Sequence, residues 1–259
     1  MTADALKNMF CLDGKVALIA GGGGDIGAAC AKAMASYGAH IVLFDASQER
    51  LAAQKQEMEA CEFEVETFWG DLLDEDFLER MIQTIISRHG RLDILLNSIA
   101  VTNRKPFLEM SRQEWETVIN VNLNGAAMLL RAAGAQMCRQ KSGKVIEVLS
   151  TGAYRFGANF TAYSASKAGL SALVKGLAIE WAPCNVQVNG IAPTATETNF
   201  TKDYYAQNPE KKEAVIRNHP YGRLGKVDDY VGAAVYLASS AADFVNGAVI
   251  MIDSGKTVK

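Results

Sequence analysis

The chain has 259 residues, of which 49% are hydrophobic and 21% are charged, and its formal net charge is −3. This composition allows a large core, and the lack of a basic excess argues against a nucleic-acid-binding protein. Five cysteines, an odd number without any CxxC spacing, argue against a disulfide framework and fit a reducing, cytoplasmic compartment.

The sequence contains no membrane or secretory signal that we can identify. No apolar run approaches the roughly 18 residues of a membrane-spanning helix, and Met1–Leu12 lacks the apolar stretch of a secretory signal. The three histidines, His40, His89 and His219, are far apart in the chain and lack metal-ligand spacing. We therefore predict no membrane association and no metal site, and we interpret each histidine as a surface or packing residue.

Short β-rich segments alternate with longer helical patterns along the chain. In chain order we predict a strand over Val16–Ala20, a helix over Gly27–Tyr37, a strand over His40–Asp45, a helix over Ser47–Cys61, a strand over Glu64–Trp69, a helix over Asp74–His89, a strand over Asp93–Asn97, one helix from Ser111 to about Gln140, a strand over Lys144–Leu149, a helix over Thr161–Trp181, a strand over Val186–Ala192, a helix over Val227–Ser239 and a strand over Ala248–Ile252. This order predicts an α/β fold, a doubly wound (Rossmann-like) parallel sheet of about seven strands with helices on both faces, in a single domain over residues 1–259. A TIM barrel also alternates in this way, but seven strands and a glycine cluster after the first strand favour the open sheet.

A glycine-rich turn, Ala20-Gly-Gly-Gly-Gly-Asp-Ile-Gly27, joins the first strand to the first long helix. Glycines let the backbone approach a pyrophosphate, and the N-terminus of the following helix attracts its negative charge. Asp45 ends the second strand, where a carboxylate can bind an adenosine ribose and repel a 2′-phosphate; the alternative role of Asp45 is a helix N-cap. Since no Lys or Arg stands in the turn or directly after Asp45, the sequence favours NAD over NADP.

Tyr163 and Lys167 stand four residues apart in a predicted helix and therefore share one face. A neighbouring cation favours the phenolate, so we predict that Lys167 lowers the pKa of Tyr163. Ser150 ends a predicted strand upstream. The three side chains together predict a proton-transfer site, although a Tyr and a Lys at this spacing are also common on solvated helix faces.

With these motifs, the chain resembles the short-chain dehydrogenase/reductase family over nearly its whole length. The matching segments are the glycine turn, Asp71-Leu72, Asn97-Ser98-Ile99-Ala100, Val121-Asn-Leu123, the Ser/Tyr/Lys set and Pro193-Thr194-Ala195-Thr196-Glu197-Thr198. The resemblance implies that the catalytic residues are Asn122, Ser150, Tyr163 and Lys167. It implies cofactor contacts from Gly21, Gly24, Asp25, Ile26, Gly27, Asp45, Asp71, Leu72, Asn97, Tyr163, Lys167, Pro193 and Thr198.

The resemblance also implies a role for each catalytic residue. Tyr163 takes the alcohol proton while a hydride passes to C4 of NAD, and Ser150 holds the substrate oxygen. Lys167 lowers the pKa of Tyr163 and hydrogen-bonds the nicotinamide ribose. Asn122 holds a water that connects Lys167 to solvent, or it is a buried amide that repairs a helix kink.

Several positions depart from the family pattern. Ala20 replaces a threonine in the turn, and Asp25 replaces a glycine. The Asp25 carboxylate disfavours phosphate binding, and NADP in particular, unless it turns away to cap a helix. Ser98, Ala100 and Thr194 also depart from the pattern and change loop positions outside the four catalytic residues.

Three features of the sequence bear on the substrate. The resemblance implies that the polar segment 194–220 forms a flap over the site, and Arg104 and Arg155 either meet a substrate carboxylate or lie on the surface. The segment Phe10–Leu18 and the pair Glu180-Trp181 are similar to sugar-acid and polyol dehydrogenases of the family. We therefore predict an NAD-dependent oxidoreductase that interconverts a secondary alcohol and a ketone on a sugar, polyol or sugar acid.

Two other functions remain open. The first is an NADPH-preferring reductase of 3-oxoacyl thioesters or other carbonyls, and the second is a non-catalytic dinucleotide-binding regulator. The resemblance further implies a homotetramer or homodimer, formed by the two long helices that follow the fourth and fifth strands.

Overall fold

The computed structural model describes residues 2–259. Met1 lies outside them, although it belongs to the predicted single domain over residues 1–259 and to the segment Met1–Leu12 in which we predicted no secretory signal. The strands are β1 (Val16–Ala20), β2 (His40–Asp45), β3 (Val65–Trp69), β4 (Ile94–Asn97), β5 (Gly143–Val148), β6 (Val186–Pro193) and β7 (Val249–Ile252). The α-helices are α1 (Ala3–Asn8), α2 (Asp25–Ser36), α3 (Gln48–Glu59), α4 (Glu75–His89), α5 (Arg112–Ile119), α6 (Ala126–Gln140), α7 (Thr161–Trp181), α8 (Asn199–Gln207), α9 (Pro209–Asn218) and α10 (Asp228–Ala238). A π-helical turn, η2 (Asn120–Gly125), joins α5 to α6.

The seven strands form one parallel sheet in the order β3-β2-β1-β4-β5-β6-β7. The order reverses direction between β1 and β4, which is the switch point at which doubly wound sheets bind their ligands, beyond the carboxyl ends of the strands. The predicted doubly wound fold is confirmed, and the TIM-barrel alternative is excluded.

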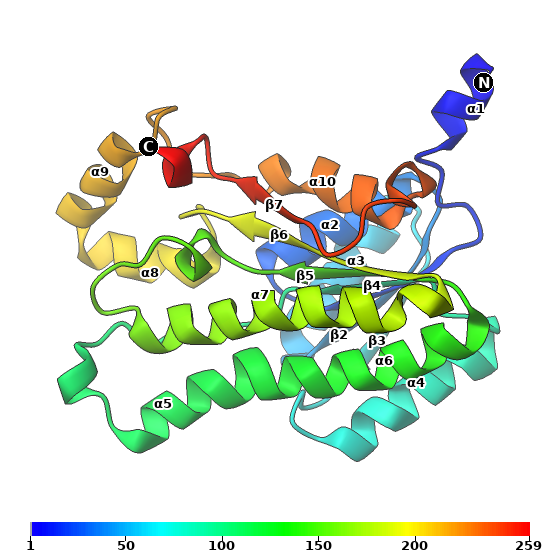
Figure 1. Cartoon of the computed structure of the whole chain (residues 1–259), viewed down its shortest axis with the longest axis horizontal. Helices are drawn as coiled ribbons and strands as arrows, with labels where there is room; N and C mark the ends of the chain where they lie inside the picture. The colour runs from blue at the N-terminus through cyan, green and yellow to red at the C-terminus, as the bar shows by residue number, and fades with distance from the viewer. Residues whose placement is uncertain (1) are drawn as a thin grey trace.

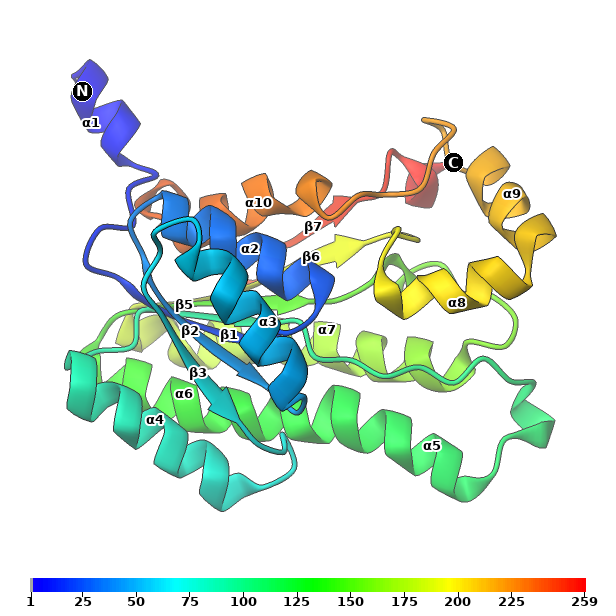
Figure 2. The same ribbon diagram turned by 180° about the vertical axis from the view of Figure 1, so that it is seen from behind.

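Helices cover both faces of the sheet, so the central strands are buried on two sides. One face packs against α4, α6 and α7 through residues such as Met81, Leu130 and Val174, and the other packs against α2, α3 and α10 through residues such as Met34 and Tyr230. Figures 1 and 2 show these two layers from opposite sides. Strands β1 and β6 are buried along their whole length: β1 is an unbroken apolar run, whereas β6 also buries the polar residues Gln187 and Asn189.

Three parts of the structure differ from the predicted elements. The predicted single helix from Ser111 to Gln140 is interrupted by η2, although the predicted capping box at Ser111 and Glu114 is present. The polar segment 194–220 contains α8 and α9, which lie at the end of the molecule far from α1 (Figures 1 and 2). Helix α2 begins at Asp25, earlier than predicted, so the end of the glycine turn already belongs to the helix.

None of the helices within residues 2–259 is both long and apolar enough to cross a membrane.

Candidate active site

The glycine turn lies at the carboxyl end of β1 and has no room for side chains. Gly21 has φ +79°, and a Cβ at Gly27 would stand under 3.0 Å from the Gly21 carbonyl oxygen. The Gly24 amide donates to that same oxygen at 2.9 Å and closes the turn. Gly24 is the N-cap of α2, and no side chain among the described residues caps this helix. The turn therefore offers backbone amides and a helix N-terminus to an anion, as a dinucleotide pyrophosphate requires.

Asp45 ends β2 beside the turn, where the adenosine end of a dinucleotide would lie. Its carboxylate accepts hydrogen bonds from the backbone amides of Gly23 at 3.2 Å and Ser47 at 2.9 Å. It does not cap the following helix, because the side chain of Ser47 accepts the α3 capping bond from the Arg50 amide. The Arg50 guanidinium contacts the Asp45 carboxylate at 3.1 Å. Although no basic residue follows Asp45 directly in the chain, the first turn of α3 places a basic side chain beside it.

Asp25 turns its carboxylate toward the segment that follows β6. It accepts hydrogen bonds from the Asn199 backbone amide at 2.8 Å and from the Asn199 side-chain amide at 2.9 Å. Asn199 is the first residue of α8, so Asp25 satisfies an amide at the N-terminus of α8 while standing in the first turn of α2. Asp25 therefore turns away as in the exception considered for it, but its carboxylate binds the first residue of α8 and does not cap α2.

Ser150, Tyr163 and Lys167 meet at the carboxyl ends of β4 and β5. Ser150 follows β5, and the other two lie on the first turns of α7. The Lys167 ammonium is buried and donates to the Val148 carbonyl at 2.7 Å. All three side chains line one cavity. The structure therefore brings together the three residues that the sequence predicted.

The predicted lowering of the Tyr163 pKa by Lys167 is wrong for this structure. Burial raises the pKa of Tyr163, and the opposing influences are a hydrogen bond with Ser150 and the positive charge of Arg104. Lys167 interacts instead with a buried carboxylate, Glu147 on β5. Burial lowers the pKa of Lys167 to about 8, and the charge of Glu147 opposes this shift.

Glu147 is a site residue that sequence reasoning missed. Its side chain is fully buried and accepts hydrogen bonds from the Asn97 side-chain amide at 3.0 and 3.3 Å. Burial raises the pKa of Glu147 to about 8, against the opposing effects of Lys167 and Asn97. The signal in the sequence was a glutamate that follows Val145 and Ile146 in a predicted strand, because a buried carboxylate needs partners.

Asn97 and Asn122 lie beneath the cavity wall, outside its lining. Asn122 sits within η2, accepts from the Val101 amide at 2.8 Å, and donates to the Val101 carbonyl at 2.9 Å and to Ser166 Oγ at 3.0 Å. In this structure the Asn122 side chain therefore joins η2 to the loop at Val101 and to Ser166 on α7, and both of its expected roles, holding a water and repairing a helix kink, stay predictions. Asn97 uses its side chain on Glu147 and on the Ile99 amide.

The cavity spans both halves of the site and has a volume of about 920 Å³. Ten of the predicted cofactor residues besides Tyr163 and Lys167 line it, namely Gly21, Gly24, Asp25, Ile26, Gly27, Asp45, Asp71, Leu72, Pro193 and Thr198. A glycine cradle without Cβ atoms, continuous with the Asp45 carboxylate and the Tyr/Lys pair, has the shape that an extended dinucleotide requires.

Cationic side chains gather at the end of the cavity near Tyr163. Arg104, Arg155, Lys211 and Lys256 all line it. The Arg104 guanidinium lies 3.6 Å from the centre of the Tyr204 ring on α8 and 4.8 Å from that of Phe160, in cation–π geometry. Arg155 donates to the Lys256 carbonyl oxygen near the C-terminus. This end of the cavity is therefore suited to a small polar anion.

His219 also lies close to the cavity wall and was not predicted there. Its Nε2 is 3.2 Å from Thr194 Oγ1 and 3.4 Å from Lys256 Nζ. Burial, followed by the positive charge of Lys256, lowers the pKa of His219, which favours the neutral imidazole.

Comparison with known proteins gives a consistent result. The sequence profile described as "Enoyl-(Acyl carrier protein) reductase" matches residues 22–257. Gluconate 5-dehydrogenase of Gluconobacter oxydans is 33% identical over 251 residues, 97% of this chain and 98% of that protein. 2-Dehydro-3-deoxy-D-gluconate 5-dehydrogenase of Pseudoalteromonas atlantica is 36% identical over 247 residues, 95% of this chain and 97% of that protein.

A solved structure is equally similar along the whole fold. The crystal structure of a gluconate 5-dehydrogenase from Burkholderia cenocepacia, described as a complex with NADP and tartrate, superposes with a TM-score of 0.92. It is 31% identical in sequence, and the match covers 97% of this chain and 98% of that chain.

Proposed function

This chain belongs to the short-chain dehydrogenase/reductase family, and from that premise we propose that it is an NAD-dependent dehydrogenase that interconverts a secondary alcohol and a ketone on a sugar acid. The observation that carries the proposal is a single cavity that holds the glycine turn, Asp45 and the Ser150/Tyr163/Lys167 set, with a group of cations at its far end.

The proposed chemistry assigns one task to each side chain. Ser150 donates a hydrogen bond to the substrate oxygen, and Tyr163 takes the alcohol proton in oxidation or returns it in reduction. Lys167, which lines the same cavity, would hydrogen-bond the nicotinamide ribose hydroxyls of bound NAD. Asn122 holds the η2 turn and the loop at Val101 in place. Bound NAD would supply the hydride acceptor, the nicotinamide C4.

The charge at the substrate end supports a sugar acid over a neutral polyol. Arg104, Arg155 and Lys256 offer donors within the same cavity, whereas the carboxylates Asp45 and Asp71 lie in the cofactor half. A carboxylate on the substrate would be attracted to the cationic end. The relatives named for gluconate and its dehydro derivatives are consistent with this choice.

The proposed preference for NAD depends on Asp45. Its carboxylate would hydrogen-bond the adenosine ribose hydroxyls and repel a 2′-phosphate. Arg50 provides the strongest argument for NADP, because its guanidinium could bind that phosphate. We expect kcat/KM to be higher with NAD, Asp45→Ala to reduce that preference, and Arg50→Ala to weaken NADP more than NAD. A parent enzyme that prefers NADP would contradict the proposed specificity.

We also propose how the chain is organised into a domain and how its copies assemble. We propose one cytoplasmic domain over residues 1–259 in which the insertion at 194–220 covers the site, because Tyr204, Tyr205 and Lys211 from α8 and α9 line the cavity. We also propose assembly into homotetramers, or homodimers, through the helices that follow β4 and β5.

The deciding experiment is a screen of sugar acids, polyols and 3-oxoacyl thioesters with NAD(H) and NADP(H), followed at the nicotinamide absorbance band. Turnover of a sugar acid with NAD supports the proposal. Preferential reduction of a 3-oxoacyl thioester with NADPH supports the reductase alternative. Tight NADH binding without turnover of any compound in the screen supports a non-catalytic regulator.

A further inference from the structure

Three side chains that could bind a metal ion meet at the amino edge of the sheet. His40 is the first residue of β2, Glu66 lies near the start of β3, and His89 is the last residue of α4. In the sheet register Val42 pairs with Glu66, so His40, two residues before Val42, points to the same face as Glu66. Helix α4 packs on that face and ends beside the two strands.

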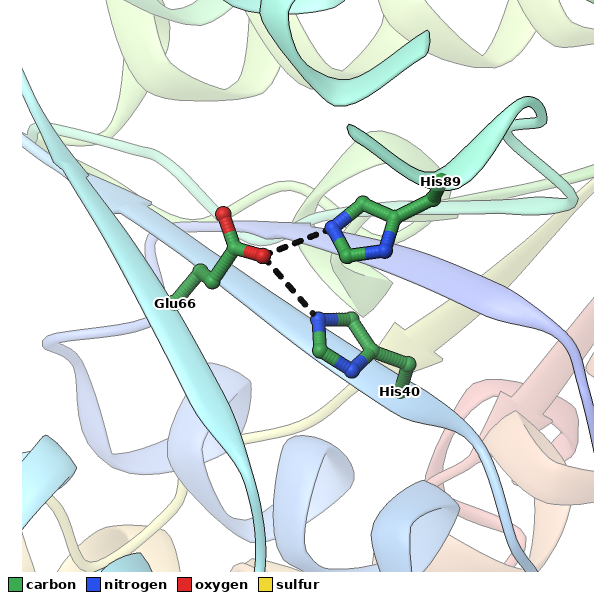
Figure 3. Close-up of side chains that lie close together, drawn as sticks. All are labelled: His40, Glu66 and His89. Atoms are coloured by element: carbon green, nitrogen blue, oxygen red, sulfur yellow. Dashed lines mark hydrogen bonds and ion pairs between the residues drawn. The ribbon is translucent and has the colours of Figure 1, made fainter. Parts of the chain in front are cut away.

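The potential ligand atoms of these residues face one another (Figure 3). His89 Nε2 lies 2.7 Å from Glu66 Oε1, and His40 Nε2 lies 3.4 Å from the same oxygen. All three ligand atoms fall within 4.8 Å of one another, and the two imidazole rings are 4.3 Å apart. The fold thus brings together three residues that are far apart in the chain, so their spacing in the sequence no longer argues against a metal site.

The Nε2 atoms of His40 and His89 differ in their hydrogen bonding. His89 Nε2 hydrogen-bonds Glu66, whereas the buried His40 Nε2 makes a 3.4 Å contact with Glu66 Oε1 and forms no hydrogen bond with the described residues. A buried imidazole nitrogen without a partner costs free energy, which a bound ligand would recover.

Arg88 holds the carboxylate in the orientation that the site needs. Its guanidinium contacts Glu66 Oε2 at 2.6 Å, which leaves Oε1 directed at the two imidazoles. Outer hydrogen bonds of this kind orient carboxylate ligands in metal sites, although the positive charge of Arg88 also weakens cation binding.

We propose that His40, Glu66 and His89 form a site for a divalent transition-metal ion such as Zn²⁺, with water in the remaining coordination position. Two imidazoles and one carboxylate are a known zinc ligand set. Tetrahedral ligands at about 2.1 Å from Zn²⁺ stand about 3.4 Å apart. The His40–Glu66 distance already matches this separation, and the His89–Glu66 distance has to lengthen by less than an ångström.

The site is separate from the proposed active site, because it lies at the opposite edge of the sheet. A bound ion would connect β2, the edge strand β3 and the end of α4 without touching the cavity. We therefore assign it a stabilising role, and its test does not depend on whether the chain turns over a sugar acid.

The first measurement is a zinc titration of chelator-treated full-length protein against a chromophoric competitor. We expect one Zn²⁺ per chain, and we expect the unfolding temperature to rise by at least about 5 °C when free zinc exceeds Kd by about 100-fold. Cobalt(II) should give visible bands of a four-coordinate site without a near-ultraviolet thiolate band. A thiolate band would place the ion on cysteine and overturn the proposal.

Matched variants locate the ion. His89→Ala and the nearly isosteric Glu66→Gln should each weaken zinc binding by at least about tenfold. Glu64→Gln, an exposed carboxylate just before β3, should bind zinc like the parent. If His89→Ala fails to fold, Glu66→Gln decides. The proposal is wrong if the parent binds no zinc, or if Glu66→Gln and His89→Ala bind it unchanged.

Discussion

Burial raises the pKa of the Tyr163 phenol, whereas a hydrogen bond with Ser150 and the positive charge of Arg104 act to lower that pKa. Arg104 in turn lies against Tyr204 of α8. The acidity of Tyr163 therefore depends on a cation that α8 holds in place. A substrate carboxylate that pairs with Arg104 would reduce this cation's influence on the phenol.

Tyr163→Phe tests the proposed acid–base residue. We expect kcat to fall by at least about 100-fold, because the proton acceptor is lost, while NADH affinity changes little. Steady-state kinetics and NADH fluorescence titration measure the two effects. Tyr37→Phe, which alters an exposed tyrosine at the end of α2, is the control and should retain parent activity. Activity within about tenfold of the parent would remove Tyr163 from the mechanism.

Glu147→Gln tests the buried pair beneath the site. Burial lowers the pKa of Lys167 to about 8, and the negative charge of Glu147 limits this shift. Because the glutamine side chain is uncharged, we expect the pKa of Lys167 in Glu147→Gln to lie below about 8. Lys167 then loses its proton at lower pH, and the alkaline limb of the kcat/KM profile should move to lower pH. Glu180→Gln on the exposed end of α7 is the control. An unmoved alkaline limb in Glu147→Gln would show that Glu147 does not control Lys167.

At the scale of elements, the contact between α6 and α7 depends on a glycine. A Cβ at Gly134 would stand under 3.0 Å from the Trp181 ring, whereas Gly176 on the exposed face of α7 has nothing within 4 Å. We expect Gly134→Ala to destabilise the fold by about 1–3 kcal/mol through overpacking. Gly176→Ala should stabilise it by about 0.5–1 kcal/mol. Urea denaturation measures both, and equal effects would contradict the packing argument.

The bond between Asp25 and Asn199 is expected to keep α8 in place. Asp25→Ala removes a cap that is worth about 1 kcal/mol, so amide exchange in α8 should accelerate about fivefold. Hydrogen exchange followed by mass spectrometry provides the measurement. Asp74→Ala removes the equivalent cap of α4, where Asp74 accepts from the Phe77 amide, and should accelerate exchange there and not in α8. Unchanged exchange in α8 after Asp25→Ala would show that Asp25 does not hold this helix.

At the scale of the whole molecule, the alternation of short β-rich segments with longer helical patterns predicted the strands well, because the central strands β1 and β4 consist mainly of apolar residues that are buried on both faces of the sheet. The four predicted catalytic positions were identifiable from local motifs, and three of them meet in the cavity. The contacts that were missed are long-range: Asp25 with Asn199, Glu147 with Asn97, and His40 with Glu66 and His89. No spacing within the chain encodes such pairs, because they arise only when parallel strands are ordered into a sheet.

The assembly prediction is tested by sedimentation velocity. We expect a homotetramer, with a homodimer as the smaller possibility, because α7 carries Ile179 with 78% of its surface exposed and the chain near β7 exposes Phe244 and Val258. Ile179→Arg should shift the distribution toward smaller species if α7 lies in the interface. A parent that sediments only as a monomer would refute this expectation.

The attachment of α8 to the first residue of α2 has a kinetic consequence. Swinging α8 outward breaks both bonds to the Asp25 carboxylate, at the place where the dinucleotide phosphates would rest. The entry of one reactant and the release of the other would then depend on the same movement of α8. We therefore expect the movement of this one segment to limit both the entry and the release of reactants.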